Sequence, residues 1–252
     1  MQSEGDYFNE VLNHDDFVRE RELWREELGN AKDLVNSCQE LQVKIDQFRY
    51  TYQWDWMGVP IIKVPDDIMV IQEFYFRFKP TAVVEIGVAR GGGMALASSL
   101  QSLLSIAPNV LGIDLKIFQH THDQLRNFGN SGMSFLECDS TSLEAQEAIS
   151  THIKDHNQIF VTLDSDHSHD HVLKELKLMN SVLPVGSVVL VADTILEEFV
   201  SSNTARNWGP GNSPASALRD FLSTNQNWSH LKDWSSRALF SESRGGWIVK
   251  KS

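Results

Sequence analysis

The stretch VVEIGVARGGG, from Val83 to Gly93, leads an apolar run into a turn that holds four glycines. Its one carboxylate, Glu85, lies inside the apolar run. An apolar strand that ends in a glycine-rich turn before a helix is typical of the first unit of an α/β sheet, where the turn approaches a nucleotide-like ligand. The stretch therefore predicts both the fold class and the position of a ligand site.

Short apolar runs recur after this stretch and alternate with amphipathic ones, which is the pattern of parallel strands linked by helices. Gly245 and Gly246 are among the few residues between the last two runs, so we expect those two strands to pair antiparallel as a hairpin. The pattern predicts an α/β, Rossmann-like sheet of six parallel strands and a last antiparallel one, with helices on both faces. The seven expected strands are Ala82–Ile86, Val110–Ile113, Ser134–Glu137, Ile159–Leu163, Ser187–Ala192, Ala238–Ser241 and Trp247–Lys250.

The N-terminal part differs in composition and is rich in Glu, Gln, Asn, Leu and Arg. Phe17, Trp24 and Leu28 recur at helical spacing, which predicts two helices hinged near Gly29. We expect residues 1–58 to form a helical appendage, used for oligomerisation or for covering a substrate. Residues 59–252 should then form the α/β domain.

The composition excludes several classes of protein. A formal net charge of -12 argues against DNA or RNA as the main partner, because phosphate backbones need clustered Lys and Arg. Cys38 and Cys138 are the only cysteines, too few for a disulfide framework or a cysteine-rich zinc site. The start is acidic, unlike a signal peptide, and no apolar run approaches the roughly 20 residues of a membrane span. We expect a soluble, cytoplasmic protein that binds small molecules.

The glycine turn departs from the dinucleotide pattern G-x-G-x-x-G. Gly87 fits its first position, but Ala89 stands at the second, which disfavours an NAD-dependent oxidoreductase. Glu85 lies two residues before Gly87, where a carboxylate attracts a cationic ligand such as a sulfonium amino acid. We therefore place a cofactor site at Glu85, Gly87, Ala89, Arg90 and Gly91.

Acidic residues also end the next two strands. Asp114 ends LGIDL, where a carboxylate can accept both hydroxyls of a ribose. Asp139 and Ser140 end ECDS, where an adenine amino group could be held. Each acid could instead be an exposed strand end or a helix cap, but all of them fall at one edge of one sheet.

The fourth and fifth strands run into LDSDHSHDHV and VLVADT. Adjacent parallel strands bring their carboxyl ends to one crevice, so Asp164 and Asp193 should converge there and form a site for Mg²⁺. His167 can lean over the same crevice and take a proton from a substrate hydroxyl. We interpret His169 and His171 as a polar helix start, since alternating histidines without cysteine have no standard zinc spacing.

These motifs, with WDWMGVPIIKVPDDIM before them and GPGNSPASALRDFL after them, resemble the cephalosporin hydroxylase / rhamnosyl O-methyltransferase family across residues 50–250. That family consists of class I S-adenosylmethionine-dependent methyltransferases, several of them Mg²⁺-dependent sugar or natural-product O-methyltransferases. The resemblance implies S-adenosylmethionine and Mg²⁺ as cofactors. It implies these roles: the methionine and ribose part of the cofactor site for Glu85 and Gly87, ribose for Asp114, adenine for Asp139 and Ser140, the first metal carboxylate beside the cofactor for Asp164, and the general base for His167.

One position departs from the family pattern. Metal-binding members end the fifth strand in a Glu-Asp pair, whereas this chain has Ala192 before Asp193. The change removes one charge and one oxygen donor. Water, Asp166 or a substrate hydroxyl could fill the vacancy, because Mg²⁺ usually keeps several waters.

The segment GPGNSPASALRDFL predicts Ser213 as a helix N-cap and Pro214 as the first helical residue. The preceding loop, residues 196–213, is a candidate lid, and its Trp208, Gly209 and Pro210 could close over the acceptor. Trp54, Trp56 and Lys63 could also face the substrate, although packing is the simpler role for the tryptophans.

Together these features predict an S-adenosylmethionine-dependent O-methyltransferase for a small hydroxylated molecule, such as a sugar or a glycosylated natural product, in a self-associating chain. Two alternatives stay open. Ala192 leaves room for a cofactor-binding protein without catalysis, and an NAD-dependent oxidoreductase is the less favoured choice because of Ala89.

Overall fold

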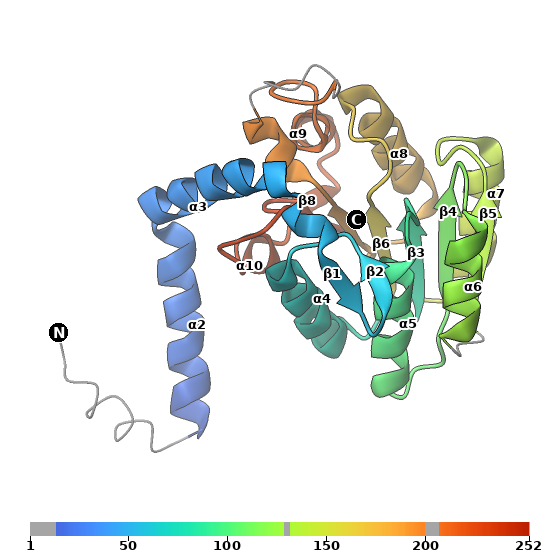
Figure 1. Cartoon of the computed structure of the whole chain (residues 1–252), viewed down its shortest axis with the longest axis horizontal. Coiled ribbons are helices and arrows are strands. Elements are labelled where there is room, and N and C mark those ends of the chain that lie inside the picture. Colours follow the sequence, from blue (N-terminus) through green and yellow to red (C-terminus); the bar gives the residue numbers. More distant parts are fainter. Residues whose placement is uncertain (1–13, 129–131, 200–206, 252) are drawn as a thin grey trace.

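A seven-stranded sheet forms the centre of the computed structural model, which describes residues 14–128, 132–199 and 207–251 (Figure 1). Its strand order is β5-β4-β3-β6-β7-β9-β8. Strands β3 to β7 are parallel, and β9 is antiparallel to both of its neighbours, so the predicted arrangement of six parallel strands and one antiparallel strand is confirmed. The strands are β3 (Ala82–Ile86), β4 (Val110–Asp114), β5 (Met133–Glu137), β6 (Ile159–Leu163), β7 (Val188–Val191), β8 (Trp228–His230) and β9 (Trp247–Lys250).

The sixth strand lies elsewhere than predicted. Residues 238–241 are not a strand; β8 (Trp228–His230) pairs with β9, and the expected hairpin at Gly245 and Gly246 is wrong. A short helix, α10 (Lys232–Ser235), and a loop connect the two strands. The loop is held by side-chain bonds instead of a strand ladder, because the Ser241 hydroxyl donates to Asp67 Oδ1 at 2.5 Å and Glu242 N donates to Asp67 Oδ2 at 2.9 Å.

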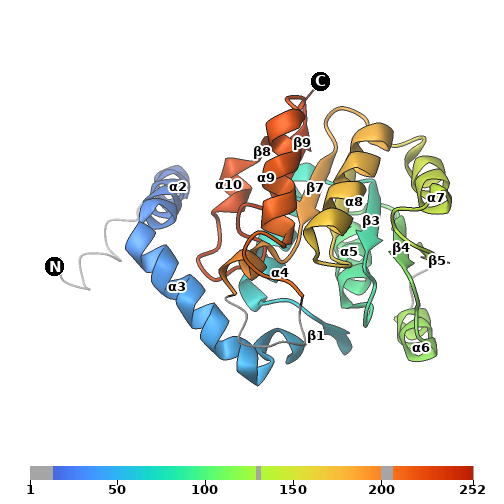
Figure 2. The ribbon, with the colours of Figure 1, turned by 90° about the horizontal axis from the view of Figure 1, so that it is seen from above.

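Helices cover both faces of the sheet (Figure 2). Alternate residues of β3 point to opposite faces, so Val84 and Ile86 join one core and Val83 joins the other. The first core includes α7 (Leu143–Ile153), α8 (His169–Val182) and α9 (Pro214–Thr224). The second includes α4 (Pro65–Phe78), α5 (Gly92–Leu103) and α6 (Gln119–Asn127).

The N-terminal helices α2 (His14–Asn30) and α3 (Lys32–Ile45) form an arm at one side of the sheet (Figure 1). The two predicted helices and their break near Gly29 are confirmed. Two 3₁₀ turns, η1 (Asp46–Phe48) and η2 (Tyr50–Tyr52), and the hairpin of β1 (Trp54–Trp56) and β2 (Val59–Ile61) then lead into the sheet. A domain boundary at residue 58 falls in the turn of this hairpin and stays a prediction.

Within the described ranges, no helix combines the length and the apolar character that crossing a membrane requires.

Candidate functional site

The glycine turn touches the end of the neighbouring strand β6. Gly87 has a φ of 93°, and a Cβ at this position would overlap the carbonyl oxygen of Asp164. Only glycine fits both the backbone conformation and this close approach. Asp114 holds the turn from the other side, since its Oδ2 accepts hydrogen bonds from Val88 N at 2.9 Å and from Ala89 N at 3.1 Å. The turn is therefore fixed between the ends of β4 and β6.

A cavity of about 810 Å³ lies over the carboxyl ends of the parallel strands. It brings together most of the predicted site residues, which come from the ends of five strands, β3 to β7: Gly87, Ala89, Asp114, Asp139, Ser140, Asp164, His167 and Asp193. Asp46, Arg49 and Tyr52 from the N-terminal segment also line it, so that segment belongs to the wall of the site.

Three predicted cofactor residues, Glu85, Arg90 and Gly91, are not among the residues that line this cavity. Glu85 is buried against the start of α5, where a Cβ on Gly93 would overlap its carboxylate. Burial raises the pKa of Glu85 to about 7, against the attraction of Lys63. The proposed contacts of these three residues with a cofactor stay predictions.

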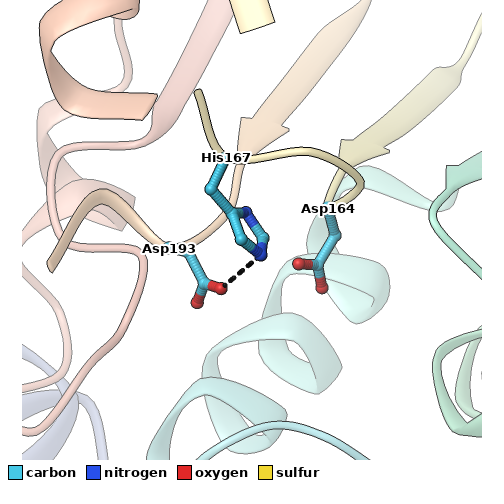
Figure 3. A group of neighbouring side chains, drawn as sticks. All are labelled: Asp164, His167 and Asp193. Atoms are coloured by element: carbon cyan, nitrogen blue, oxygen red, sulfur yellow. Dashed lines mark ion pairs between the residues drawn. The ribbon is translucent and has the colours of Figure 1, made fainter. Parts of the chain in front are cut away.

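Asp164, His167 and Asp193 converge beside the cavity (Figure 3). One ligand atom from each lies within 4.8 Å of the others. His167 Nε2 lies 3.2 Å from Asp193 Oδ2, and the Trp208 ring meets the imidazole edge-on at a centroid distance of 4.7 Å. Asp193 has a positive φ of 54°, which directs the chain after β7 into the turn η3 (Thr194–Glu198). The convergence expected from the strand ends is therefore present.

Lys63 lies closer to the three converging residues than the sequence interpretation suggested, because it contacts Asp164 directly. Its ammonium group lies 3.0 Å from Asp164 Oδ2, with only 7% of the residue exposed. Burial opposes the charge, but Asp164 and Glu85 outweigh it and raise the pKa of Lys63 above its ordinary value. Burial would likewise raise the pKa of Asp164, and Lys63 with His167 lowers it. A lone Lys in the apolar segment PIIKVP was the signal for a buried cation.

Glu242 is a site residue that sequence reasoning missed. It lines the cavity from the loop before β9, and its Oε2 accepts a hydrogen bond from Val64 N at 3.2 Å. Burial, together with Asp193 and Asp67, raises the pKa of Glu242 well above its ordinary value. The surrounding residues SESRGG have the composition of an exposed turn, so no sequence signal indicated this position.

The histidines after His167 divide into two roles. His169 follows the prediction of a polar helix start, because its Nδ1 lies 2.9 Å from the Ser216 hydroxyl and its Nε2 lies 3.5 Å from Asp220 Oδ2. His171 departs from that prediction, since it lines the cavity next to Ser140. It turns inward because Glu175, one helical turn later, binds its ring at 3.1 Å.

The loop before α9 is described only in part. Residues 200–206 of the candidate lid lie outside the described residues, while Trp208 lines the cavity. The predicted cap is confirmed: Ser213 accepts a hydrogen bond from Ser216 N, and Pro214 is the first residue of α9. The packing role of the tryptophans is confirmed for Trp56. Its Nε1 donates a hydrogen bond to Ser99 Oγ at 2.9 Å, and Trp56 is not among the residues that line the cavity.

Strand order, helices on both faces and a cavity over the carboxyl ends of the parallel strands define a class I methyltransferase fold. The chain belongs to the Rhamnosyl O-methyltransferase/CmcI family, whose model matches residues 48–251.

Among curated proteins, the rhamnosyl O-methyltransferase of Mycobacterium leprae (strain TN) is 29% identical over 143 residues, which are 56% of this chain and 60% of that protein. The Mycobacterium tuberculosis (strain H37Rv) protein of the same name is 30% identical over 142 residues, or 55% of this chain and 56% of its own. The chain thus matches little more than half the length of these relatives.

Solved structures support the fold. CmcI with magnesium and S-adenosylmethionine has a TM-score of 0.58 at 17% identity, covering 80% of this chain and 78% of that chain. The O-methyltransferase TomG from Streptomyces achromogenes, in complex with SAM, has a TM-score of 0.51 at 10% identity, covering 87% of this chain and 90% of its own.

Proposed function

We propose that this chain is an S-adenosylmethionine-dependent O-methyltransferase. The observation that carries the proposal is the convergence of Asp164, His167 and Asp193 within 4.8 Å in a cavity whose wall also holds the glycine turn and Asp114. The shared cavity supports binding of a nucleoside cofactor and acceptance of a proton in one volume. Family membership and the names of the mycobacterial relatives support the same reaction.

In the proposed reaction His167 is the general base. It accepts the proton of the acceptor hydroxyl while that oxygen forms a bond to the methyl carbon and the carbon–sulfur bond breaks, leaving its electron pair on sulfur. Asp193, at 3.2 Å, holds the imidazole and stabilises the positive charge that the ring gains. Transfer needs the oxygen, carbon and sulfur in line, which the shared cavity permits.

The residues present fit a hard cation. Asp164 and Asp193 offer carboxylate oxygens, the donors that Mg²⁺ prefers, and both line the cavity. When bound, Mg²⁺ would orient the acceptor hydroxyl and lower its pKa. Ala192 contributes no donor, so the acceptor and water would complete the coordination.

We propose a small hydroxylated acceptor, such as a sugar or a glycosylated natural product. The relatives' name, rhamnosyl O-methyltransferase, supports a sugar acceptor. The cavity wall offers Tyr52 and Trp208 as aromatic surfaces, Trp208 in contact with His167, and sugars pack well on such rings. A cytoplasmic location fits the two unpaired cysteines. The exposed leucines of α2 and α3 support self-association.

The first test separates this function from its two alternatives. Calorimetry with S-adenosylhomocysteine should show heat of binding, and calorimetry with NAD should show none. Heat with NAD alone would favour the oxidoreductase. Binding of S-adenosylhomocysteine without methyl transfer to any hydroxylated acceptor in a panel of sugars and glycosides would favour a cofactor-binding protein.

The second test concerns the base. His167→Ala should lower the rate of methyl transfer by a factor on the order of 100 or more, while the affinity for S-adenosylhomocysteine changes little. His169→Ala is the matched control, since that ring bonds Ser216 outside the cavity. Equal turnover by the His167→Ala variant and the unaltered chain would refute the assignment.

A further inference from the structure

Four polar side chains meet between the starts of α7 and α8. Ser140, Ser165 and His171 line the cavity, whereas Glu175 lies behind them with 0% of its surface exposed. Glu175 Oε1 receives the Ser140 hydroxyl at 2.6 Å, the Ser165 hydroxyl at 2.6 Å and His171 Nε2 at 3.1 Å. The proposed methyl transfer uses none of these contacts.

The four side chains do not form a hydrolytic triad. In a triad the imidazole separates the serine from the acid and uses a different ring nitrogen for each. Here His171 Nε2 faces both Ser140 Oγ, at 3.0 Å, and Glu175 Oε1, and Ser140 donates directly to the carboxylate. The serine proton thus goes to the acid and not to a base, so the cluster must serve another purpose.

Counting the protons shows what the cluster presents to the cavity. A hydroxyl group has one proton, and those of Ser140 and Ser165 are both directed at Glu175. Each serine oxygen can therefore only accept a hydrogen bond from a ligand. The neighbouring Asp139 carboxylate, also on the wall, is an acceptor as well.

Burying a carboxylate this deeply opposes folding unless it is well bonded. Glu175 Oε1 has three donors, yet Oε2 is buried and has no partner among the residues that the structure describes. The hydrogen bond to Glu175 raises the pKa of His171. Burial of Glu175 with one oxygen unpartnered within the described ranges costs folding free energy. That the chain keeps it there indicates that Glu175 has a function, which we assign to orienting the hydroxyl groups of Ser140 and Ser165.

The cluster joins the ends of two strands of the sheet. Ser140 follows β5, next to β4 with Asp114, and Ser165 follows β6 directly after Asp164, two residues before His167. We infer that Glu175 turns Ser140 and Ser165 into an acceptor-only wall that selects the 6-amino group of the bound purine over a 6-oxo group. The inference rests on the proposed function, because it assumes a purine nucleoside ligand.

The chemistry of the two bases explains the selection. Adenine carries two amino protons at C6, which an acceptor wall can bond, whereas hypoxanthine carries an oxygen there, whose lone pairs would face those of Ser140 and Ser165. A site built to bond one group rejects the analogue that leaves its polar atoms unpaired. Glu175 acts through the serines and is a positioning residue.

Calorimetry with S-adenosylhomocysteine and S-inosylhomocysteine tests the inference, since the two ligands differ only at C6. The unaltered chain should prefer the adenosyl ligand by at least about tenfold. Ser140→Ala, Ser165→Ala and the isosteric Glu175→Gln should each reduce that ratio several-fold. Ser142→Ala is the control: it removes the N-cap of α7, which accepts from Ala145 N, and should lower the Tm without changing the ratio.

Each result has one reading. An unchanged ratio in both serine variants, or equal affinity of the unaltered chain for the two ligands, overturns the inference and leaves the proposed function intact. Failure of the unaltered chain to bind S-adenosylhomocysteine overturns the proposed function instead. If Glu175→Gln does not fold, the two serine variants decide alone; if it folds and weakens both ligands equally, Glu175 is only structural.

Discussion

At the scale of single residues, Lys63 controls the charge of the site. Its ammonium lies 3.0 Å from Asp164 and is buried with Glu85 and Glu242 nearby, so one fixed positive charge offsets several carboxylates. A charge in this position also repels any cation that approaches Asp164. We therefore expect Lys63 to stabilise the acidic site and to weaken the binding of a metal ion there.

Lys63→Met should tighten binding of Mn²⁺, a probe for the Mg²⁺ site, by about tenfold or more, because a unit charge ~5 Å away contributes roughly 3 kcal/mol at an effective dielectric constant of 20. Calorimetry on the chain without cofactor measures the affinity. Lys63→Met should also unfold at a lower Tm and regain more of it with Mn²⁺ than the unaltered chain does.

Lys63→Arg, which keeps the charge, and Lys177→Met on the exposed side of α8 are the controls and should bind Mn²⁺ as the unaltered chain does. Equal affinity in Lys63→Met would show that Lys63 does not regulate the metal site.

The sequence predicted those site residues that follow from strand ends. Asp114, Asp164 and Asp193 each end a parallel strand, and such ends meet at one edge of the sheet by construction. Lys63 was predicted only to face the substrate, and Glu242 was not predicted, because their contacts depend on how distant loops fold over that edge. For Glu242 no local pattern records such a contact.

At the scale of elements, the strands with strong signals were predicted and the weakest one was not. The parallel strands β3, β4, β6 and β7 are buried, apolar and rich in β-branched residues, whereas β5 is only partly buried. Each of the five was located within two residues of its observed start and end. Strand β8 has three residues, two of them polar, and lies at the sheet edge. Its pairing with β9 is decided by tertiary packing, so a short apolar run at residues 238–241 looked more strand-like.

The helix α3 has two faces with different partners. Val35 and Gln42, seven residues apart, are buried against the rest of the chain. Leu34 and Leu41, also seven residues apart, are 48% and 50% exposed, so they form an apolar stripe beside the buried one. We expect a second copy of the chain to cover that stripe, as an exposed row of leucines favours association.

Replacing Leu34 and Leu41 together by Gln should dissociate the assembly, because it removes the apolar area that drives association. Light scattering after size exclusion should give the mass of a multimer for the unaltered chain and of a monomer for the double variant. Leu103→Gln, at a site 77% exposed at the end of α5, is the control and should leave the mass unchanged. A monomeric unaltered chain would contradict the proposal.

At the scale of the whole molecule, distant segments meet at one buried carboxylate. Asp67 in α4 accepts hydrogen bonds from the Ser241 hydroxyl and from Glu242 N, which joins the second helical layer to the loop before β9. The same loop brings Glu242 to the cavity, where its carboxylate accepts a hydrogen bond from Val64 N. The closure of the site therefore depends on a contact that links the N-terminal and C-terminal parts of the domain.

That contact predicts how stability changes with pH. Burial raises the pKa of Asp67 from 3.8 to about 6, despite the hydrogen bonds from Ser241 and Glu242. A raised pKa means that the folded chain holds this proton more tightly than the unfolded chain does. The stabilisation is therefore complete below pH 3.8 and is lost as the pH rises through 6. A shift of about two units corresponds to roughly 3 kcal/mol.

Asp67→Asn removes this titration. We compare the free energy of unfolding of the unaltered chain with that of the variant, and we expect the difference (unaltered minus variant) to fall by roughly 3 kcal/mol between pH 4 and pH 7. Urea unfolding at four pH values measures the difference. Acids far from Asp67 cancel because both chains contain them, and Glu242, whose pKa Asp67 helps to raise, changes the difference in the same direction. Asp155→Asn, at an exposed position, should show a constant difference. If Asp67→Asn also shows a constant difference, Asp67 does not couple the closure of the site to pH, and its hydrogen bonds alone hold the loop.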